Sequence, residues 1–187
     1  MNTLINHIKE LIELDEKQVL QLTSITLPKN FEKDDVLLDI NKTCKKLYFI
    51  NEGLLKISFF SEEKEYIMKF FVTNEFCSVL DSLTTQMPSQ YSIIALSESL
   101  ITEIDYMKLK ELAAQDQAFE RILSHIPVLA TQKMMARIRE LLETEAKDRY
   151  LNFIKSNGHL INLISLKDLS KYLGISQVTL SRIRASL

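Results

Sequence analysis

The stretch that decides the fold is SLKDLSKYLGISQVTLSRIRASL, residues 165–187. Its apolar side chains fall, on either side of Gly174, at the positions that two short helices need to pack at a steep angle across a turn of about three or four residues. They are Leu169, Leu173, Ile175, Leu180 and Ile183. Gly174 can adopt the positive φ of such a turn, and Ser170 is small enough to let the second helix approach. The pattern predicts a helix-turn-helix; an ordinary helical hairpin is the alternative.

The second of these helices leaves short polar side chains and arginines on its surface. Ser165 and Ser176 are placed to N-cap the two helices. The exposed positions carry the side-chain types that read base edges and contact phosphates in the major groove of DNA. They are Gln177, Val178, Ser181, Arg182 and Arg184. Arg184 has a second interpretation, because a cation near a helix C-terminus also complements the helix dipole. The segment predicts double-stranded DNA as a partner.

The charge of the chain is unevenly distributed. The formal net charge of the 187 residues is −2. Residues 1–130 contain 13 Lys and Arg against 20 Asp and Glu, whereas residues 131–187 contain 10 against 5. An acidic body with a basic C-terminal third favours a polyanion as the partner of that third. Chance clustering would give the same distribution.

The composition excludes several classes of protein. Hydrophobic residues make up 46% of the chain and charged residues 26%, as in globular proteins that are neither disordered nor fibrous. No uncharged apolar run approaches the roughly 18 residues of a membrane-spanning helix, and the first residues do not form a signal peptide. Cys44 and Cys77 make neither a disulfide framework nor a CxxC metal motif. We therefore expect a cytoplasmic protein with no membrane partner and no metal.

The middle of the chain predicts an antiparallel β-structure. From Ile25 onward, short runs rich in aromatic and β-branched residues alternate with polar turns, and such even spacing predicts a sandwich or barrel. The runs are LYFI (47–50), LLKISFF (54–60), YIMKFF (66–71) and YSIIAL (91–96). The carboxylate pairs Asp34-Asp35 and Glu62-Glu63 lie in polar turns. Strand content is expected to end near Ile104. Residues 3–23 have helical spacing, with Asp15 as an N-cap between two short helices.

Residues 106–156 are predicted to be helical. Pro127 predicts either the first turn of a helix or a break. Beyond it, a stripe steps by three and four residues through Val128, Thr131, Met135, Ile138 and Leu142. Such a stripe suits a long helix that packs against a second copy of itself, so it predicts a homodimer. A helix face buried in the core of the same chain would give the same stripe.

This order of elements resembles the CRP/FNR superfamily of bacterial transcription regulators. DLSKYLGISQVTLSRIR (168–184) is similar to the recognition unit of that family, and KDRYLNFI (147–154) and PSQYSIIALSES (88–99) resemble its Bacteroidetes-like branch. The resemblance implies an α+β fold in which an antiparallel β-roll, or double-stranded β-helix of the cyclic-nucleotide-binding type, is flanked by helices. It implies a sensor domain over 1–115, a long dimerisation helix over 116–145 and an all-α helix-turn-helix domain over 146–187. The printed sequence shows no β-hairpin wing after this helix, so wing contacts with DNA are not expected.

The resemblance also implies which residues contact DNA. Gln177, Val178 and Arg182 fall where the family reads bases, and Thr179 falls where it contacts a phosphate. Arg182 suits bidentate pairing with guanine, while Val178 can only meet a thymine methyl group. The full set of candidate DNA-binding residues is Ser176, Gln177, Val178, Thr179, Ser181, Arg182 and Arg184. The implied partners are a second copy of the chain, a palindromic operator and RNA polymerase.

The sensor half departs from the family pattern. Cyclic-nucleotide-binding relatives hold the cyclic phosphate with a Gly-Glu-Leu turn and an Arg-Ser pair, where this chain has residues 78–80 (Ser-Val-Leu) and Ser89-Gln90. A phosphate without a cationic partner would be a buried, uncompensated charge. On the long helix the base-contacting positions hold Met134 and Met135. We therefore expect cAMP to bind poorly and leave the small-molecule effector open. The candidate pocket residues are Ser78, Ser89, Gln90, Tyr91 and Met134.

Other classes of function lack their motifs. Iron–sulfur relatives need four cysteines, and His7, His125 and His159 are too far apart in sequence to suggest a metal set. A cupin enzyme would need clustered metal ligands such as His-x-His. The sequence has no P-loop, no GxSxG and no Gly-rich dinucleotide turn. We expect no enzymatic activity. The remaining alternative is a small-molecule or protein-interaction sensor whose terminal helices have lost DNA binding.

Overall fold

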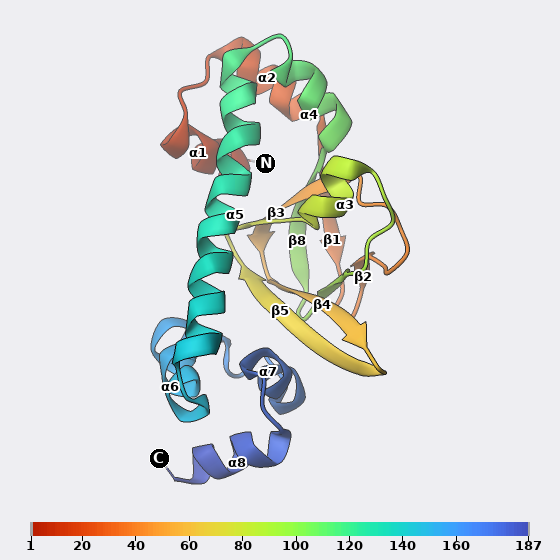
Figure 1. Cartoon of the computed structure of the whole chain (residues 1–187). Coiled ribbons are helices and arrows are strands. Elements are labelled where there is room, and N and C mark those ends of the chain that lie inside the picture. The colour runs from red at the N-terminus through yellow and green to blue at the C-terminus, as the bar shows by residue number, and fades with distance from the viewer. Residues whose placement is uncertain (1, 187) are drawn as a thin grey trace.

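The computed structural model describes residues 2–186 and consists of a β-roll, a long helix beside it and a group of short C-terminal helices (Figure 1). The strands are β1 (Thr26–Phe31), β2 (Val36–Leu38), β3 (Lys46–Glu52), β4 (Leu54–Ser61), β5 (Lys64–Val72), β6 (Phe76–Cys77), β7 (Ser92–Ala95) and β8 (Ser99–Asp105). They form two four-stranded sheets, in the orders β1-β8-β3-β6 and β2-β7-β4-β5. All pairs of neighbouring strands are antiparallel. The predicted strand runs and the end of strand content near Ile104 are confirmed.

Helices precede the roll, interrupt it once at α3 and follow it in the chain. They are α1 (Asn2–Leu11), α2 (Glu16–Ser24), α3 (Leu80–Thr85), α4 (Tyr106–Ala113), α5 (Gln117–Glu143), α6 (Ala146–Asn157), α7 (Leu166–Leu173) and α8 (Gln177–Ala185), with a 3₁₀ turn, η1, at Gly158–Leu160. The predicted N-cap is confirmed: the Asp15 side chain accepts from the Gln18 backbone N–H, and the Gln18 side chain accepts from the Asp15 N–H. The mixed α+β class is confirmed as well.

The two sheets enclose an apolar interior. Alternate residues of the strands point inward and form one buried cluster that includes Leu55, Ile57 and Ile93, joined by Cys44 and Cys77. Burial raises the pKa of the Cys77 thiol well above its usual range. The roll therefore has an apolar core of its own, to which α3 contributes Leu83.

The turn between β3 and β4 requires glycine. Gly53 has a φ of +118°, and a Cβ at this position would lie 2.1 Å from the Oγ atom of Ser99. A side chain would therefore meet both backbone strain and a steric clash. This turn starts β4, which faces the C-terminal helices.

Helix α5 corrects the expectation about Pro127. The helix does not begin or break there but runs without interruption through Pro127, ten residues after its start. An internal proline removes one helix hydrogen bond and costs about 3 kcal/mol in isolation. Packing outweighs this cost, because Phe119, Ile122 and Ile126 are buried against α1, α4 and the outer face of β3 and β8. Further along the same face of α5, Lys133 pairs with Glu75. Glu75 also pairs with Lys69, at 3.2 Å.

The C-terminal helices form a third core together with the roll. Leu54, Ile67 and Phe70 from β4 and β5 share one buried cluster with residues of α6, α7 and α8. Figure 1 shows α7 beside the β4–β5 hairpin, with α8 beyond it at the end of the molecule. The C-terminal unit is therefore docked on the roll. Within residues 2–186, no helix has the length and apolar character that crossing a membrane requires.

Candidate nucleic-acid interface and sensor pocket

The two last helices have the geometry that the sequence predicts. Gly174 lies between α7 and α8 with a φ of +71°, in the left-handed region. The Ser165 hydroxyl accepts from the Asp168 N–H at 3.0 Å, and the Ser176 hydroxyl accepts from the Thr179 N–H at 3.0 Å. Both predicted N-caps are therefore confirmed, and each helix start is fixed by a short side chain.

Helix α8 has one buried and one exposed face. Leu180 is fully buried and Ile183 packs against the same cluster, which anchors the helix to α7. The candidate DNA-binding residues all lie outside this contact. Those exposed to solvent are Ser176, Gln177, Val178, Thr179, Ser181, Arg182 and Arg184. The structure thus brings them together on one accessible surface, at the end of the molecule furthest from the N-terminal helices (Figure 1).

Some basic side chains of the C-terminal unit, residues 146–187, bond to other groups of the protein. Residues 146–187 carry seven Lys or Arg and two Asp or Glu. The Arg149 Nε atom donates to the Leu173 carbonyl at 3.1 Å, and Arg137 of α5 donates to the Tyr172 carbonyl, so both last carbonyls of α7 are capped by arginine. Lys171 pairs with Glu65 of the roll. The remaining basic side chains, Lys147, Lys155, Lys167, Arg182 and Arg184, are exposed.

Four of the five candidate sensor residues, all but Met134, lie between β6 and β7. The Ser78 hydroxyl donates to the Lys46 carbonyl at 3.0 Å. Ser89 is buried; its hydroxyl donates to the Tyr91 carbonyl at 2.8 Å and accepts from the Tyr91 N–H at 2.9 Å. Gln90 is exposed, and Met134 lies on α5 with 54% of its surface exposed.

The roll, but not the whole chain, matches a known protein family by sequence. Residues 28–116 match the family model of the cyclic nucleotide-binding domain. This part of the chain, which includes seven of the eight strands in full, is therefore similar to that domain. A search with the sequence found no match among curated proteins.

Solved structures match over most of the chain. FixK2 from Bradyrhizobium japonicum superposes with a TM-score of 0.75 at 16% identity, covering 87% of this chain and 84% of that one. A protein of Eubacterium rectale assigned to the CRP/FNR family of transcriptional regulators gives 0.75 at 15% identity, covering 91% and 82%. The c-di-GMP responsive global regulator CLP of Xanthomonas campestris gives 0.73 at 14%, covering 92% and 91%. The fold is that of CRP/FNR transcription regulators; these similarities do not assign a branch.

The loop before β7 has no cation of its own that could pair with a cyclic phosphate. In the described loop 86–91, which leads into β7, no side chain is cationic. The one buried hydroxyl of this loop, Ser89, already bonds to its own chain. Backbone hydrogen bonds join Ser89 to Asn41 and Lys42 at 2.8 and 2.9 Å, so the loop is closed against residues 41–42. Figure 1 shows the loop after α3 on the side of the roll away from α5, which carries Met134.

One pocket of about 400 Å³ lies at the edge of the roll, on residues that sequence reasoning missed. Leu38 and Tyr48, which also belong to the apolar interior, form part of its wall, and its basic side chains are Lys42, Lys45 and Lys46. The only sequence signal was the basic run KTCKK (42–46) directly before a strand. Lys46 already pairs with Asp105 at 3.3 Å.

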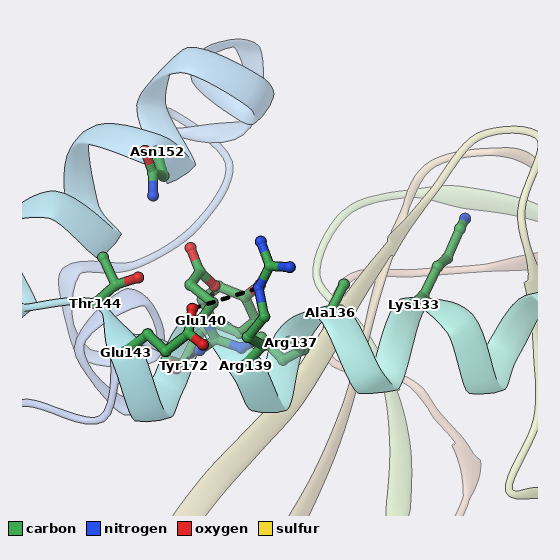
Figure 2. Close-up of a pocket in the computed structure, with 9 residues that line it drawn as sticks. All are labelled: Lys133, Ala136, Arg137, Arg139, Glu140, Glu143, Thr144, Asn152 and Tyr172. Atoms are coloured by element: carbon green, nitrogen blue, oxygen red, sulfur yellow. Dashed lines mark hydrogen bonds and ion pairs between the residues drawn. The ribbon is translucent and has the colours of Figure 1, made fainter.

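A second pocket of about 400 Å³ lies between α5, α6 and α7 (Figure 2). Charged side chains dominate its lining, but they pair with one another: Arg137 with Glu140, and Arg139 with Glu143 at 3.5 Å, the latter in Figure 2. Lys133 pairs with Glu75. This internal neutralisation gives an anionic ligand little to bind. Within the described residues 2–186, no group of His, Cys, Asp or Glu is arranged to hold a metal ion.

Sequence reasoning also missed a cluster of four charges between the roll and the C-terminal unit. Its members are Lys56 of β4, Glu65 of β5, and Asp168 and Lys171 of α7. Burial raises the pKa of Glu65, but hydrogen bonds from Lys171 and Lys56 outweigh this effect and lower it to about 2. Burial likewise opposes the charge of Lys56, but Glu65 and Asp168 raise its pKa. Both shifts favour the charged forms of Glu65 and Lys56 at neutral pH. A lysine inside the strand run LLKISFF was the one signal in the sequence.

Proposed function

We propose that the chain is a DNA-binding transcription regulator of the CRP/FNR type. The observation that carries the proposal is the exposed surface of α8 and its N-cap Ser176, which holds all seven candidate residues, while Leu180 and Ile183 anchor the helix from its other side. The basic charge of the C-terminal third and the fold shared with transcription regulators support it. In this proposal residues 1–115 form the sensor, 116–145 the connecting helix and 146–187 the DNA-binding domain. The protein acts in the cytoplasm and without enzymatic activity of its own.

The proposal includes a homodimer formed through α5. The stripe Val128, Thr131, Met135, Ile138 and Leu142 is exposed in the single chain, so it does not belong to the chain's own core. At about 100° per residue it lies opposite Phe119, Ile122 and Ile126, which pack on the roll. Exposed apolar patches of this kind mark interaction sites. A two-fold pair of chains would present two copies of α8 to a palindromic operator.

Selection from a pool of random duplex DNA tests the proposal. The full chain is incubated with the pool, bound duplexes are recovered and amplified, and the enriched sequences are read. We expect an inverted repeat whose half-sites are spaced by about one helical turn, 10–10.5 base pairs. No enrichment over several rounds would refute DNA reading and favour the alternative of a sensor that has lost DNA binding.

Two substitutions on α8 separate base reading from phosphate contact. Arg182→Ala is expected to weaken binding to the selected operator by about 1–3 kcal/mol and to relax the preference at one base pair of each half-site. Thr179→Ala is expected to weaken binding to operator and scrambled DNA equally, since a phosphate contact carries no sequence information. Electrophoretic shift titrations on both duplexes measure the difference. Equal losses for Arg182→Ala on both duplexes would mean that Arg182 contacts only the backbone.

The Thr179 experiment needs one control. The Thr179 and Ser176 hydroxyls lie 2.8 Å apart, so Thr179→Ala also disturbs the N-cap of α8. Thr179→Ser keeps a hydroxyl at this position and should retain both the cap and the phosphate contact. A loss with Thr179→Ser as large as with Thr179→Ala would show that the hydroxyl is not what matters.

We propose that the sensor domain does not respond to cAMP. A cyclic phosphate in the loop before β7 would lack a charge-assisted partner, because Ser89 and Gln90 stand where relatives have an Arg-Ser pair. We expect isothermal titration calorimetry of the full chain with cAMP to show binding no tighter than millimolar. Micromolar affinity would contradict this and would require a different cation at the phosphate. CLP, of the same fold, is responsive to c-di-GMP, which supports an effector other than cAMP.

A further inference from the structure

The β4–β5 hairpin has two different faces. Residues that point inward, such as Leu55 and Ile57, belong to the apolar interior of the roll. Between them, Lys56 points outward, and across the hairpin Glu65 and Phe70 lie on the same outer side. This outer side is covered by α7 of the C-terminal unit. One layer of sheet therefore separates the sensor interior from the first helix of the helix-turn-helix.

The charged cluster on this face is closed and balanced. The Lys56 Nζ atom lies 3.0 Å from Glu65 Oε1 and 3.1 Å from Asp168 Oδ1, and Lys171 pairs with the second oxygen of Glu65. The four side chains are only 10–17% exposed. Two cations and two anions leave no net charge, and each carboxylate meets at least one lysine. Removing a single partner would leave a charge buried without compensation.

An aromatic group next to this cluster adds a second point of attachment. The ring of Phe70 on β5 lies 6.2 Å from Phe153 of α6 and 5.0 Å from Tyr172 of α7, measured between centroids. The guanidinium of Arg137 on α5 stacks 3.9 Å from the Tyr172 ring and also donates to the Tyr172 carbonyl. Tyr172 is thus where the roll, α5, α6 and α7 meet.

These contacts fix the orientation of α8 relative to α5. Apolar packing alone is non-directional, whereas ion pairs and a stacked guanidinium hold one register. Helix α7 is held by the roll through Asp168 and Lys171 and by α5 through Tyr172. Helix α8 follows α7 rigidly, because Leu180 is buried against it. The direction of the exposed face of α8 is therefore set by groups that do not belong to that face.

We propose that Lys56, Glu65, Asp168 and Lys171, together with the Arg137–Tyr172 stack, are positioning residues that set the half-site spacing the dimer reads. This inference rests on the proposed function. Two recognition helices bind one operator at once only if their separation matches the half-site spacing. Simultaneous engagement raises affinity by about 10²–10⁴, and this gain is lost when geometry forbids it. When α7 is held rigidly on the roll and on α5, the affinity gained from binding both half-sites depends sharply on the spacing between them.

The test compares Glu65→Gln with Glu63→Gln. Glu65→Gln weakens the pairs with Lys56 and Lys171 with little change of shape, whereas Glu63 is exposed in the turn of the same hairpin and serves as the matched control. The probes are the selected inverted repeat, the same repeat with about five base pairs inserted, which turns one half-site by about half a helical turn, and a single half-site. Affinities are measured for the full chain.

For the wild type and Glu63→Gln, we expect the insertion to weaken binding about a hundredfold or more, down to half-site affinity. For Glu65→Gln, we expect weaker binding to the correctly spaced operator, unchanged half-site affinity, and a loss upon insertion of less than about tenfold. Unchanged half-site affinity shows that α8 is still folded, which a merely structural role for Glu65 would not predict.

A second pair of variants tests the inference if Glu65→Gln alone has no effect. Arg137→Met removes the stack on Tyr172, and Arg139→Gln changes the neighbouring exposed arginine instead. In Arg137→Met, as in Glu65→Gln, we expect the inserted base pairs to weaken binding by less than about tenfold. The inference would be overturned if the insertion weakened binding as strongly in both Glu65→Gln and Arg137→Met as in the wild type, or if either variant bound the operator more tightly. Both outcomes would leave the proposed function intact. Failure of the wild type to bind any duplex would refute the proposed function, and the inference with it.

Discussion

Leu180→Asp is expected to unfold the C-terminal helices and to abolish specific DNA binding. Leu180 is fully buried in the cluster that joins α7, α8 and the outer face of β4 and β5. An aspartate there would lose the apolar contacts and bury a carboxylate without a partner. Together these effects are expected to destabilise the C-terminal unit by about 4 kcal/mol or more.

Hydrogen exchange read by mass spectrometry distinguishes local from global unfolding. Peptides from residues 146–186 should lose protection in Leu180→Asp, while peptides from β3 and β8 should keep it, because Leu180 does not belong to the clusters that surround those strands. Val178→Asp is the matched control: Val178 lies two residues away and is 60% exposed, so the fold should be unaffected. Native protection of α7 and α8 in Leu180→Asp would contradict the packing described for Leu180.

Much of the helix-turn-helix could be predicted because its determinants are local. The spacing of Leu169, Leu173 and Leu180, the positive φ of Gly174 and the N-caps at Ser165 and Ser176 all act within about ten residues of chain. Each of them has a direct steric or hydrogen-bonding reason. The structure confirms all of them. The DNA-contacting roles of the exposed residues stay a prediction.

Elements that depend on distant contacts were missed or left open. Strand β1 contains Pro28, which argues against a central strand, but β1 lies at the edge of its sheet, where a missing N–H is tolerated. Pro127 is accommodated because both the roll and the N-terminal helices hold α5 in place. The pairing of Lys56 with Asp168 joins residues 112 positions apart, and no local pattern encodes such a contact.

The sequence left two alternatives for the apolar stripe on α5, and the structure removes one of them. The same spacing suits a core face within the chain or a surface for a second copy. Exposure of Met135 at 62% and Leu142 at 81% removes the first alternative. The second copy itself stays a proposal, and the following substitution tests it.

Replacing both Met135 and Ile138 with glutamate is expected to give a monomer that no longer binds the operator tightly. The two side chains lie near the centre of the exposed stripe, so in a two-fold dimer each glutamate would be buried against the partner helix, close to its own symmetry copy. Like charges in an apolar interface cost free energy both by desolvation and by repulsion. Because a monomer engages one half-site only, operator affinity should fall by roughly a hundredfold or more.

Light scattering coupled to size-exclusion chromatography measures the change directly. At micromolar concentration the wild type should have twice the mass of the 21.7 kDa chain, and the double variant the mass of a single chain. Gln132→Glu combined with Ala136→Glu is the matched control, since both positions are exposed on α5 but lie off the stripe; it should remain dimeric. Half-site affinity should be equal in all three proteins, because α8 is unchanged. A wild type that is monomeric under these conditions would overturn the dimer, and with it the reading of paired half-sites.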